Sequence, residues 1–94
     1  MHKKTLSNLV VTGIPESDIE FVELLLDEVA FARGKYPSNT VLFAALVEEV
    51  GEVAKALQDE TRDRLVAELV QVAAMALRLA VEGDPAYEKS IPEN

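Results

Sequence analysis

Cysteine is absent from the 94-residue chain, and no long apolar run occurs near its start. The lack of cysteine excludes a disulfide framework, a thiol nucleophile and a thiolate metal site. The apolar run from Leu9 to Val11 is too short for the core of a signal peptide or for a membrane span. We therefore expect a cytoplasmic protein without a membrane partner.

Basic residues are also few, because nine Lys and Arg stand against seventeen Asp and Glu, and the net charge is −8. Such a chain repels a polyanionic backbone, which argues against nucleic acid and anionic membranes as partners. It also disfavours a small regulator such as an antitoxin, since those commonly carry a basic DNA-binding portion. A small phosphate ester that arrives with its own cation stays compatible with this charge.

Hydrophobic patterning predicts an all-α fold, an antiparallel helical bundle with helices over residues 18–33, 39–60 and 62–82. Residues 1–15 are expected to form an N-terminal arm or a short strand ahead of a single helical domain over residues 16–94. A domain of this size buries only about two-thirds of its extended surface, so a second subunit is a natural cover for apolar helix faces. We expect a homodimer or a homotetramer.

Local residue chemistry suggests where these helices begin and end. The Ser17 to Glu20 segment has a capping-box pattern for the first helix, and Gly34 is predicted to end it. Ser38 or Asn39 is the expected cap of the second helix. Gly83 is expected to end the third.

Three glutamates interrupt the apolar pattern of the second helix. With successive residues about 100° apart, Glu49 projects into the middle of the apolar arc formed by Leu42 to Leu57. Glu52 lies on the edge of that arc about one turn further on, and Glu48 points away from it. A charge aimed into an apolar layer is costly unless it is paired, and a divalent cation held by several oxygens is one such partner.

The third helix is apolar almost all round. From Leu65 to Val81 its only polar side chains are Glu68, Gln71 and Arg78, which predicts a place at the centre of the bundle. Glu68 and Gln71 are neighbours on the helix surface because they are three residues apart. These few polar groups are grouped on one side of the helix.

An antiparallel arrangement of the second and third helices would bring their polar pairs together. Counting outward from the short connection places Glu52 near the level of Glu68, and Glu49 near that of Gln71. Two polar pairs would then face one another across a helix interface.

A purely structural role is the alternative for each of the charged side chains. A buried ion pair of Glu49 with Arg64 or Arg78 would also satisfy the charge. Glu48 has the alternative of being a plain solvated residue. Arg33, Lys35 and Tyr36 have the alternative of ordinary loop chemistry.

The pattern EEVGE at 48–52, followed by ELVQ at 68–71, resembles the EExxE and ExxD signature of MazG-like all-α nucleoside triphosphate pyrophosphohydrolases, which are related to dimeric dUTPases. The resemblance covers roughly residues 18–83. It implies a MazG-like bundle that binds Mg²⁺, with Mn²⁺ as a possible substitute. The implied metal ligands are Glu49, Glu52, Glu68 and Gln71, the last of which stands where the family has aspartate.

This resemblance implies cleavage of a nucleoside triphosphate between the α- and β-phosphates, giving the monophosphate and pyrophosphate. The implied catalytic acids are Glu48, Glu49 and Glu52, and Lys35 or Arg78 is expected to meet the leaving pyrophosphate. Glutamine at position 71 offers a carbonyl oxygen without a charge, so it should weaken metal binding. The alternative that Gln71 favours is a catalytically silent helical module acting in oligomerisation or partner binding.

Overall fold

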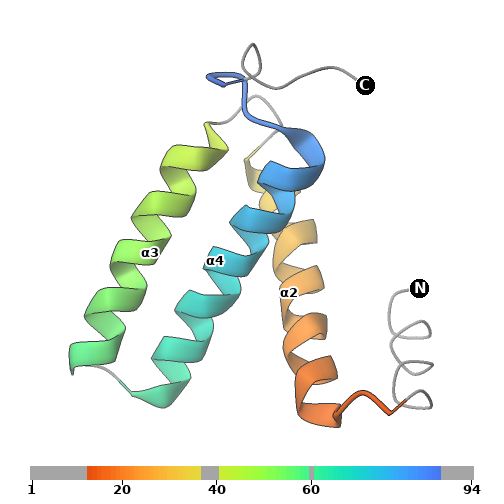
Figure 1. The fold of residues 1–94 in the computed structure, drawn as a ribbon, viewed down its shortest axis with the longest axis vertical. Helices are drawn as coiled ribbons and strands as arrows, with labels where there is room; N and C mark the ends of the chain where they lie inside the picture. The colour runs from red at the N-terminus through yellow and green to blue at the C-terminus, as the bar shows by residue number, and fades with distance from the viewer. Residues whose placement is uncertain (1–12, 37–40, 60, 88–94) are drawn as a thin grey trace.

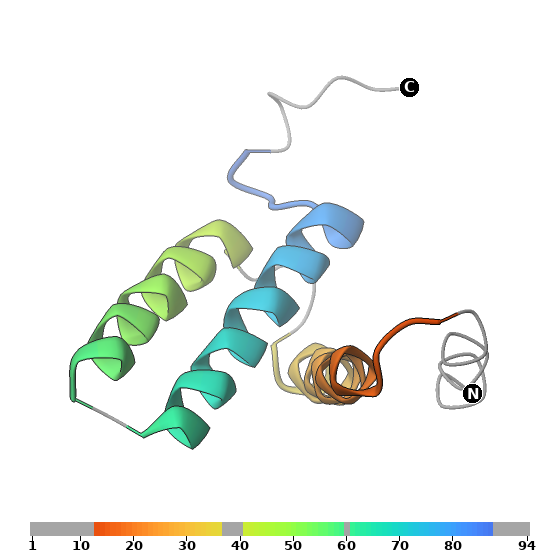
Figure 2. The same ribbon diagram turned by 60° about the horizontal axis from the view of Figure 1, so that its bottom comes forward.

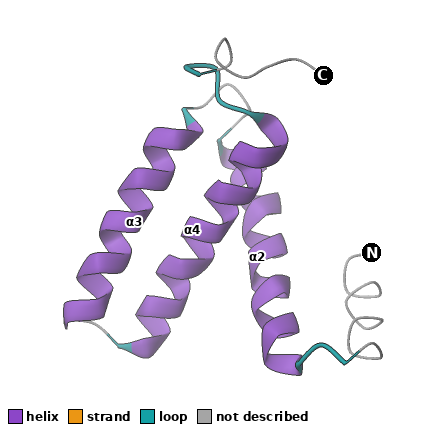
Figure 3. Cartoon of the chain, in the orientation of Figure 1, coloured by secondary structure: helices purple, strands orange, loops and turns teal. Residues whose placement is uncertain are grey.

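The computed structural model describes residues 13–36, 41–59 and 61–87, which are almost entirely helical (Figures 1 and 3). The helices are α2 (Glu16–Lys35), α3 (Leu42–Asp59) and α4 (Arg62–Glu82), and no strand occurs among the described residues. The predicted all-α class is therefore confirmed. The strand considered near Leu9 lies outside the described residues, as do the cap residues Ser38 and Asn39. None of the described helices combines the length and apolar character that crossing a membrane requires.

Helix α4 lies between the other two helices and packs against both (Figures 1 and 2). Helices α3 and α4 are antiparallel neighbours, as predicted, and they are joined by a short connection. Within the described part of the chain, the backbones of α2 and α3 do not contact each other. The apolar character of α4 thus places it at the centre, as its sequence indicated.

The hydrophobic core lies where the three helices meet near the upper half of α4 in Figure 1. Its buried members come from all three helices: Val29 and Ala32, Leu42, and Ala74 with Met75. Ala32, Leu42 and Ala74 have at most 1 % of their surface exposed. Their burial supplies the main favourable term of folding, about 25 cal/mol for each Å² of apolar surface removed from water.

The predicted capping box at the start of the first helix is wrong. Helix α2 begins earlier, at Glu16, with Pro15 as its N-cap and without a side-chain cap. The carbonyl oxygen of Pro15 accepts from the N–H groups of Asp18 and Ile19 at 3.1 and 3.3 Å, so Ser17 already lies inside the first turn. Glu16 and Asp18 instead favour the helix start through the positive end of its dipole.

The predicted stop at Gly34 is also wrong, because α2 continues through it to Lys35. Its C-cap is Tyr36, which is extended (φ −124°, ψ 96°), as expected for a residue that precedes a proline. The start predicted for the second helix is too early, since Val41 is still outside α3. The predicted end of α4 is confirmed: Gly83 takes a positive φ of 76° that favours glycine, and its N–H donates to the Leu79 carbonyl.

Candidate functional site

A cavity of about 300 Å³ lies where the three helices meet. Its volume is at the lower end of the range for small-molecule sites. Helix α2 and its cap contribute Glu28, Ala32 and Tyr36; α3 contributes Leu42, Ala45, Glu48 and Glu49; α4 contributes Gln71, Met75 and Arg78. Carboxylates, an amide and a guanidinium therefore share one cavity with aliphatic and aromatic side chains.

The antiparallel register of α3 and α4 orders this lining. Glu49 and Gln71 are equally far from the connecting turn, and both line the cavity, as the predicted pairing requires. One turn further from the connection, Ala45 and Met75 form an apolar level. The acidic part of the lining is thus separated along the helices from an apolar part.

Glu49 carries the clearest electrostatic signal in the cavity. Its pKa is raised above the ordinary value, first by burial and then by the negative charges of Glu68, Glu52, Glu48 and Glu28. No described lysine or arginine forms an ion pair with its carboxylate. The ionised group is therefore held in an unfavourable field that a bound cation would relieve.

Among the described residues, neither Arg64 nor Arg78 forms the alternative ion pair with Glu49. Arg64 pairs with Glu68, its neighbour one turn on, at 3.5 Å. Arg78 pairs with Glu82 at 2.8 Å. Both candidate cations are engaged elsewhere on their own helix, because partners four residues apart on one helix lie side by side.

The remaining predicted metal ligands lie beside the cavity, outside its lining. Glu68 is buried, with 8 % of its surface exposed, and Glu52 is half-buried. Both are close enough to Glu49 for their charges to raise its pKa. The four predicted ligands thus occupy one neighbourhood, in which only Glu49 and Gln71 face the cavity.

Glu48 was expected to point away from the apolar arc of α3, and its exposed side chain agrees with this prediction. Its side chain is exposed, yet it contributes to the cavity lining next to Glu49. An exposed residue in the lining marks a place where the cavity opens to solvent. Glu48 therefore lies at the rim, between the solvent and the acidic part of the cavity.

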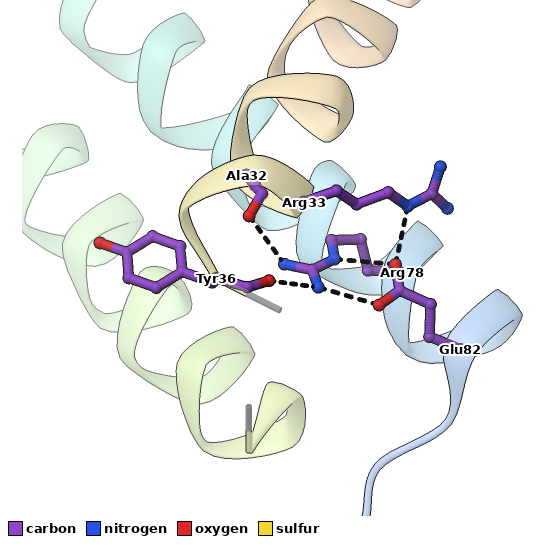
Figure 4. A network of polar contacts seen from close by, with 5 residues as sticks. All are labelled: Ala32, Arg33, Tyr36, Arg78 and Glu82. Carbon is purple, nitrogen blue, oxygen red and sulfur yellow. Dashed lines mark hydrogen bonds and ion pairs between the residues drawn. The ribbon is translucent and has the colours of Figure 1, made fainter. Parts of the chain in front are cut away.

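The two predicted phosphate-binding cations differ in their surroundings. Arg78 lines the cavity, but its guanidinium is fully buried and bonded to Glu82 and to backbone carbonyls of α2 (Figure 4). The Nζ atom of Lys35 lies 5.4 Å from the ring centroid of Tyr36 and 5.9 Å from that of Phe31. Lys35 lies outside the cavity lining but next to Tyr36, which belongs to it.

Sequence reasoning missed Glu28 as a member of the site. It lies one turn before Ala32 on α2, lines the cavity and contributes to the raised pKa of Glu49. A single glutamate on an amphipathic helix has the same local pattern as a solvated residue, so no local signal distinguishes it. Only the crossing of α2 over α4 brings it to the acids of α3.

The donor set fits a hard divalent cation in chemistry, since carboxylate and amide oxygens are the ligands that Mg²⁺ takes. Glu49, Glu52, Glu68 and Gln71 supply such oxygens around one neighbourhood with an excess of negative charge. In the described ranges, no group of three or more His, Asp or Glu side chains is already gathered at metal-binding separations. Comparisons with protein-family models, curated proteins and solved structures found no match for this chain.

Proposed function

We propose that the chain is a cytoplasmic, metal-dependent nucleoside triphosphate pyrophosphohydrolase with a MazG-like fold. The observation that carries this proposal is the position of Glu49. Its carboxylate faces a cavity, has a raised pKa caused by burial and by four neighbouring carboxylates, and has no described cation as a partner. A site with this excess of negative charge favours a bound divalent cation, which can in turn coordinate the phosphate oxygens of a triphosphate.

Glu49, Glu52, Glu68 and the carbonyl oxygen of Gln71 would hold Mg²⁺, or Mn²⁺ in its place. When bound, the cation neutralises phosphate oxygens and lowers the pKa of a coordinated water. Magnesium usually keeps several water or phosphate ligands, so three carboxylates and one amide are a sufficient protein contribution. With glutamine at position 71 in place of aspartate, the site has about one negative charge fewer and binds the cation more weakly.

An acid at the cavity rim or beside the cavity accepts the proton of the attacking water. Glu48 lies in the lining and is exposed, so a water at the rim is within the reach of its carboxylate. Glu48 or Glu52 orients a water and accepts its proton while the water oxygen bonds to the α-phosphorus. The bond from the α-phosphorus to the bridging oxygen breaks, and pyrophosphate leaves with the electron pair.

The proposal includes a homodimer or a homotetramer. Apolar side chains are exposed on each helix, among them Phe31 at 62 %, Leu57 at 68 % and Val81 at 69 %. Exposed apolar surface of this kind is typical of subunit interfaces.

The experiment that tests the function is a panel of ribo- and deoxyribonucleoside triphosphates scored for pyrophosphate release with Mg²⁺ and with EDTA. We expect Mg²⁺-dependent release from at least one triphosphate, lost in Glu49→Gln. Release of orthophosphate in place of pyrophosphate would contradict the assigned bond.

A second candidate is a silent helical module, and two observations favour it. Gln71 replaces the aspartate of the family motif, and no three acids in the described ranges are gathered at metal-binding separations. Titration calorimetry with Mg²⁺ and a non-hydrolysable triphosphate separates the candidates. Metal-dependent binding supports the enzyme, and no binding supports the module.

A further inference from the structure

The guanidinium of Arg78 ties the end of α2 to the end of α4 (Figure 4). Arg78 has no exposed surface. Its Nη1 donates to the Ala32 carbonyl at 3.3 Å, and its Nη2 donates to the Tyr36 carbonyl at 2.7 Å. Its Nε and Nη2 also donate to the two oxygens of Glu82, at 2.9 and 2.8 Å. We call this set of bonds the Arg78 clamp.

The bonds of the clamp answer two needs at once. The last carbonyl oxygens of a helix carry the negative end of its dipole, which favours a cation at that end. A buried guanidinium needs a carboxylate and several acceptors, because its desolvation costs several kcal/mol. The Ala32 carbonyl already accepts from the Tyr36 N–H at 2.6 Å, so Arg78 is a second donor to it and also donates to the carbonyl of Tyr36. Glu82 in turn supplies the carboxylate that the buried guanidinium needs.

The clamp acts on one wall of the cavity. Ala32 and Tyr36, whose carbonyls it holds, both line the cavity, and Glu28 lies one turn before Ala32 on the same helix. The backbone of α2 makes no contact with α3 among the described residues. The α2 wall is therefore placed by its contacts with α4. At the cavity end the directional contacts are the clamp and, at the surface, the ion pair of Arg33 with Glu82 at 2.8 Å.

We propose that Arg78, held by Glu82, is a positioning residue that sets the separation of the α2 and α3 walls, and that it binds no phosphate itself. Its Nε, Nη1 and Nη2 atoms already donate to Glu82 and to the carbonyls of Ala32 and Tyr36, so they are not directed at a phosphate. The role of Arg78 in setting the helix separation can be tested without any enzymatic activity. The part that concerns phosphate rests on the proposed function.

The absence of cysteine makes a direct measurement simple. Spin labels at Ala30→Cys on α2 and Ala54→Cys on α3, both exposed positions, report the separation of the two helices. Mixing labelled chains with an excess of unlabelled chains eliminates the signal from pairs of labels on different subunits. The distribution is recorded for the parent, for Arg78→Lys, for Glu82→Gln, and for Arg62→Lys as the control at an exposed position on α4.

We expect a single narrow distribution in the parent and in the control. Arg78→Lys and Glu82→Gln should each broaden the distribution or shift its centre, because lysine cannot form the planar fork and glutamine removes the charge that holds it. Circular dichroism confirms that each variant is folded before it is measured. If Arg78→Lys fails to fold, Glu82→Gln decides the matter, since it retains volume and one hydrogen bond. Folded variants with the parent's distribution would overturn the inference.

A second measurement separates positioning from phosphate binding. If Arg78 only positions the wall, Arg78→Lys and Glu82→Gln should both lower kcat by about tenfold or more while inhibition by added pyrophosphate changes less than about twofold. A phosphate ligand would behave differently: Arg78→Lys would weaken pyrophosphate inhibition, and Glu82→Gln would strengthen it by releasing the guanidinium. That pattern would overturn the phosphate part of the inference. If no nucleotide is hydrolysed, the proposed function fails, whereas the helix separation still tests the clamp.

Discussion

One carboxylate oxygen of Asp84 accepts a hydrogen bond from the backbone N–H of Phe43 at 2.6 Å, although 41 residues separate them. Asp84 has only 1 % of its surface exposed, and its other oxygen accepts from the N–H of Ala86 at 2.8 Å. Helix α3 has no acidic residue in its first turn, so Asp84 supplies negative charge to the positive end of that helix. The rings of Phe43 and Tyr87 meet edge to face at 5.4 Å and strengthen the same junction.

Replacing Asp84 with alanine should lower the free energy of unfolding by about 0.5–2 kcal/mol, the range measured for the loss of an N-cap. Asp84→Asn keeps an acceptor oxygen but loses the charge, so it should cost less. Urea unfolding followed by circular dichroism measures both variants. Equal stability of Asp84→Ala and the parent would show that this contact does not stabilise α3.

Acidification should weaken the Arg78 clamp in a defined window. The pKa of Glu82 is lowered from 4.5 to about 2, first by its hydrogen bond to Arg78 and also by Arg33. A lowered pKa in the folded state gives stability that is complete above pH 4.5 and is lost as the pH falls toward 2.

We therefore expect the melting temperature of Glu82→Gln to approach that of the parent as the pH falls through this window. Above about pH 5 the parent should be the more stable of the two. Calorimetric melts at neutral pH and at several points between the two pKa values make the comparison. A difference in melting temperature between the two proteins that does not change with pH would contradict the lowered pKa of Glu82.

Neutralising Glu49 should have opposite effects with and without metal. Its raised pKa means that the folded state loses stability as the pH rises from 4.5 through the raised value. Without metal at neutral pH, Glu49→Gln should therefore melt at a higher temperature than the parent. With Mg²⁺, the variant should gain no stability and show no metal-dependent activity.

Glu48→Gln serves as the matched control for this pair of melts, because it is adjacent but exposed. It should change the metal-dependent stabilisation less than Glu49→Gln does. Full activity in Glu49→Gln would show that the assigned metal site is wrong.

Gln71→Asp tests the residue at which the sequence departs from the MazG-like motif that it resembles. Adding a carboxylate beside Glu49 increases repulsion in the metal-free protein, so the melting temperature without Mg²⁺ should fall. The shift produced by Mg²⁺ should be larger than in the parent, because metal binding is stronger and stabilises the fold by mass action. Equal destabilisation with and without Mg²⁺ would place residue 71 in an ordinary helix interface and favour the silent module.

The exposed apolar residues of α4 provide a test of oligomerisation. Leu69 and Val81 are exposed by 38 % and 69 % of their surface. A Val81→Asp substitution should shift the sedimentation coefficient toward that of a single chain at micromolar concentration without loss of helical content. A parent protein that is already monomeric and fully helical at that concentration would contradict the proposed dimer or tetramer.

Much of the fold follows from local patterns. The helical periodicity predicted the three helices, and the few polar residues between Leu65 and Val81 predicted the central place of α4. The register of two antiparallel helices follows from counting residues from their turn, so the facing of Glu49 and Gln71 was accessible from the sequence. The start of α4 at Arg62 was predicted correctly, whereas that of α2 was not, because Pro15 competes with the capping pattern at Ser17.

The sequence by itself determined the helices, their polar pairs and the excess of acids near Glu49, since these depend on spacing along one helix or across one short turn. Only the tertiary structure decided that Glu28 joins those acids, that Arg78 binds the end of α2 and that Asp84 caps α3. The hydrogen bonds from Phe43 to Asp84 and from Arg78 to Ala32 join residues that are 41 and 46 positions apart. Their geometry depends on how α2 crosses α4 and how the chain turns after Gly83, and neither angle is encoded in the periodicity of a single helix.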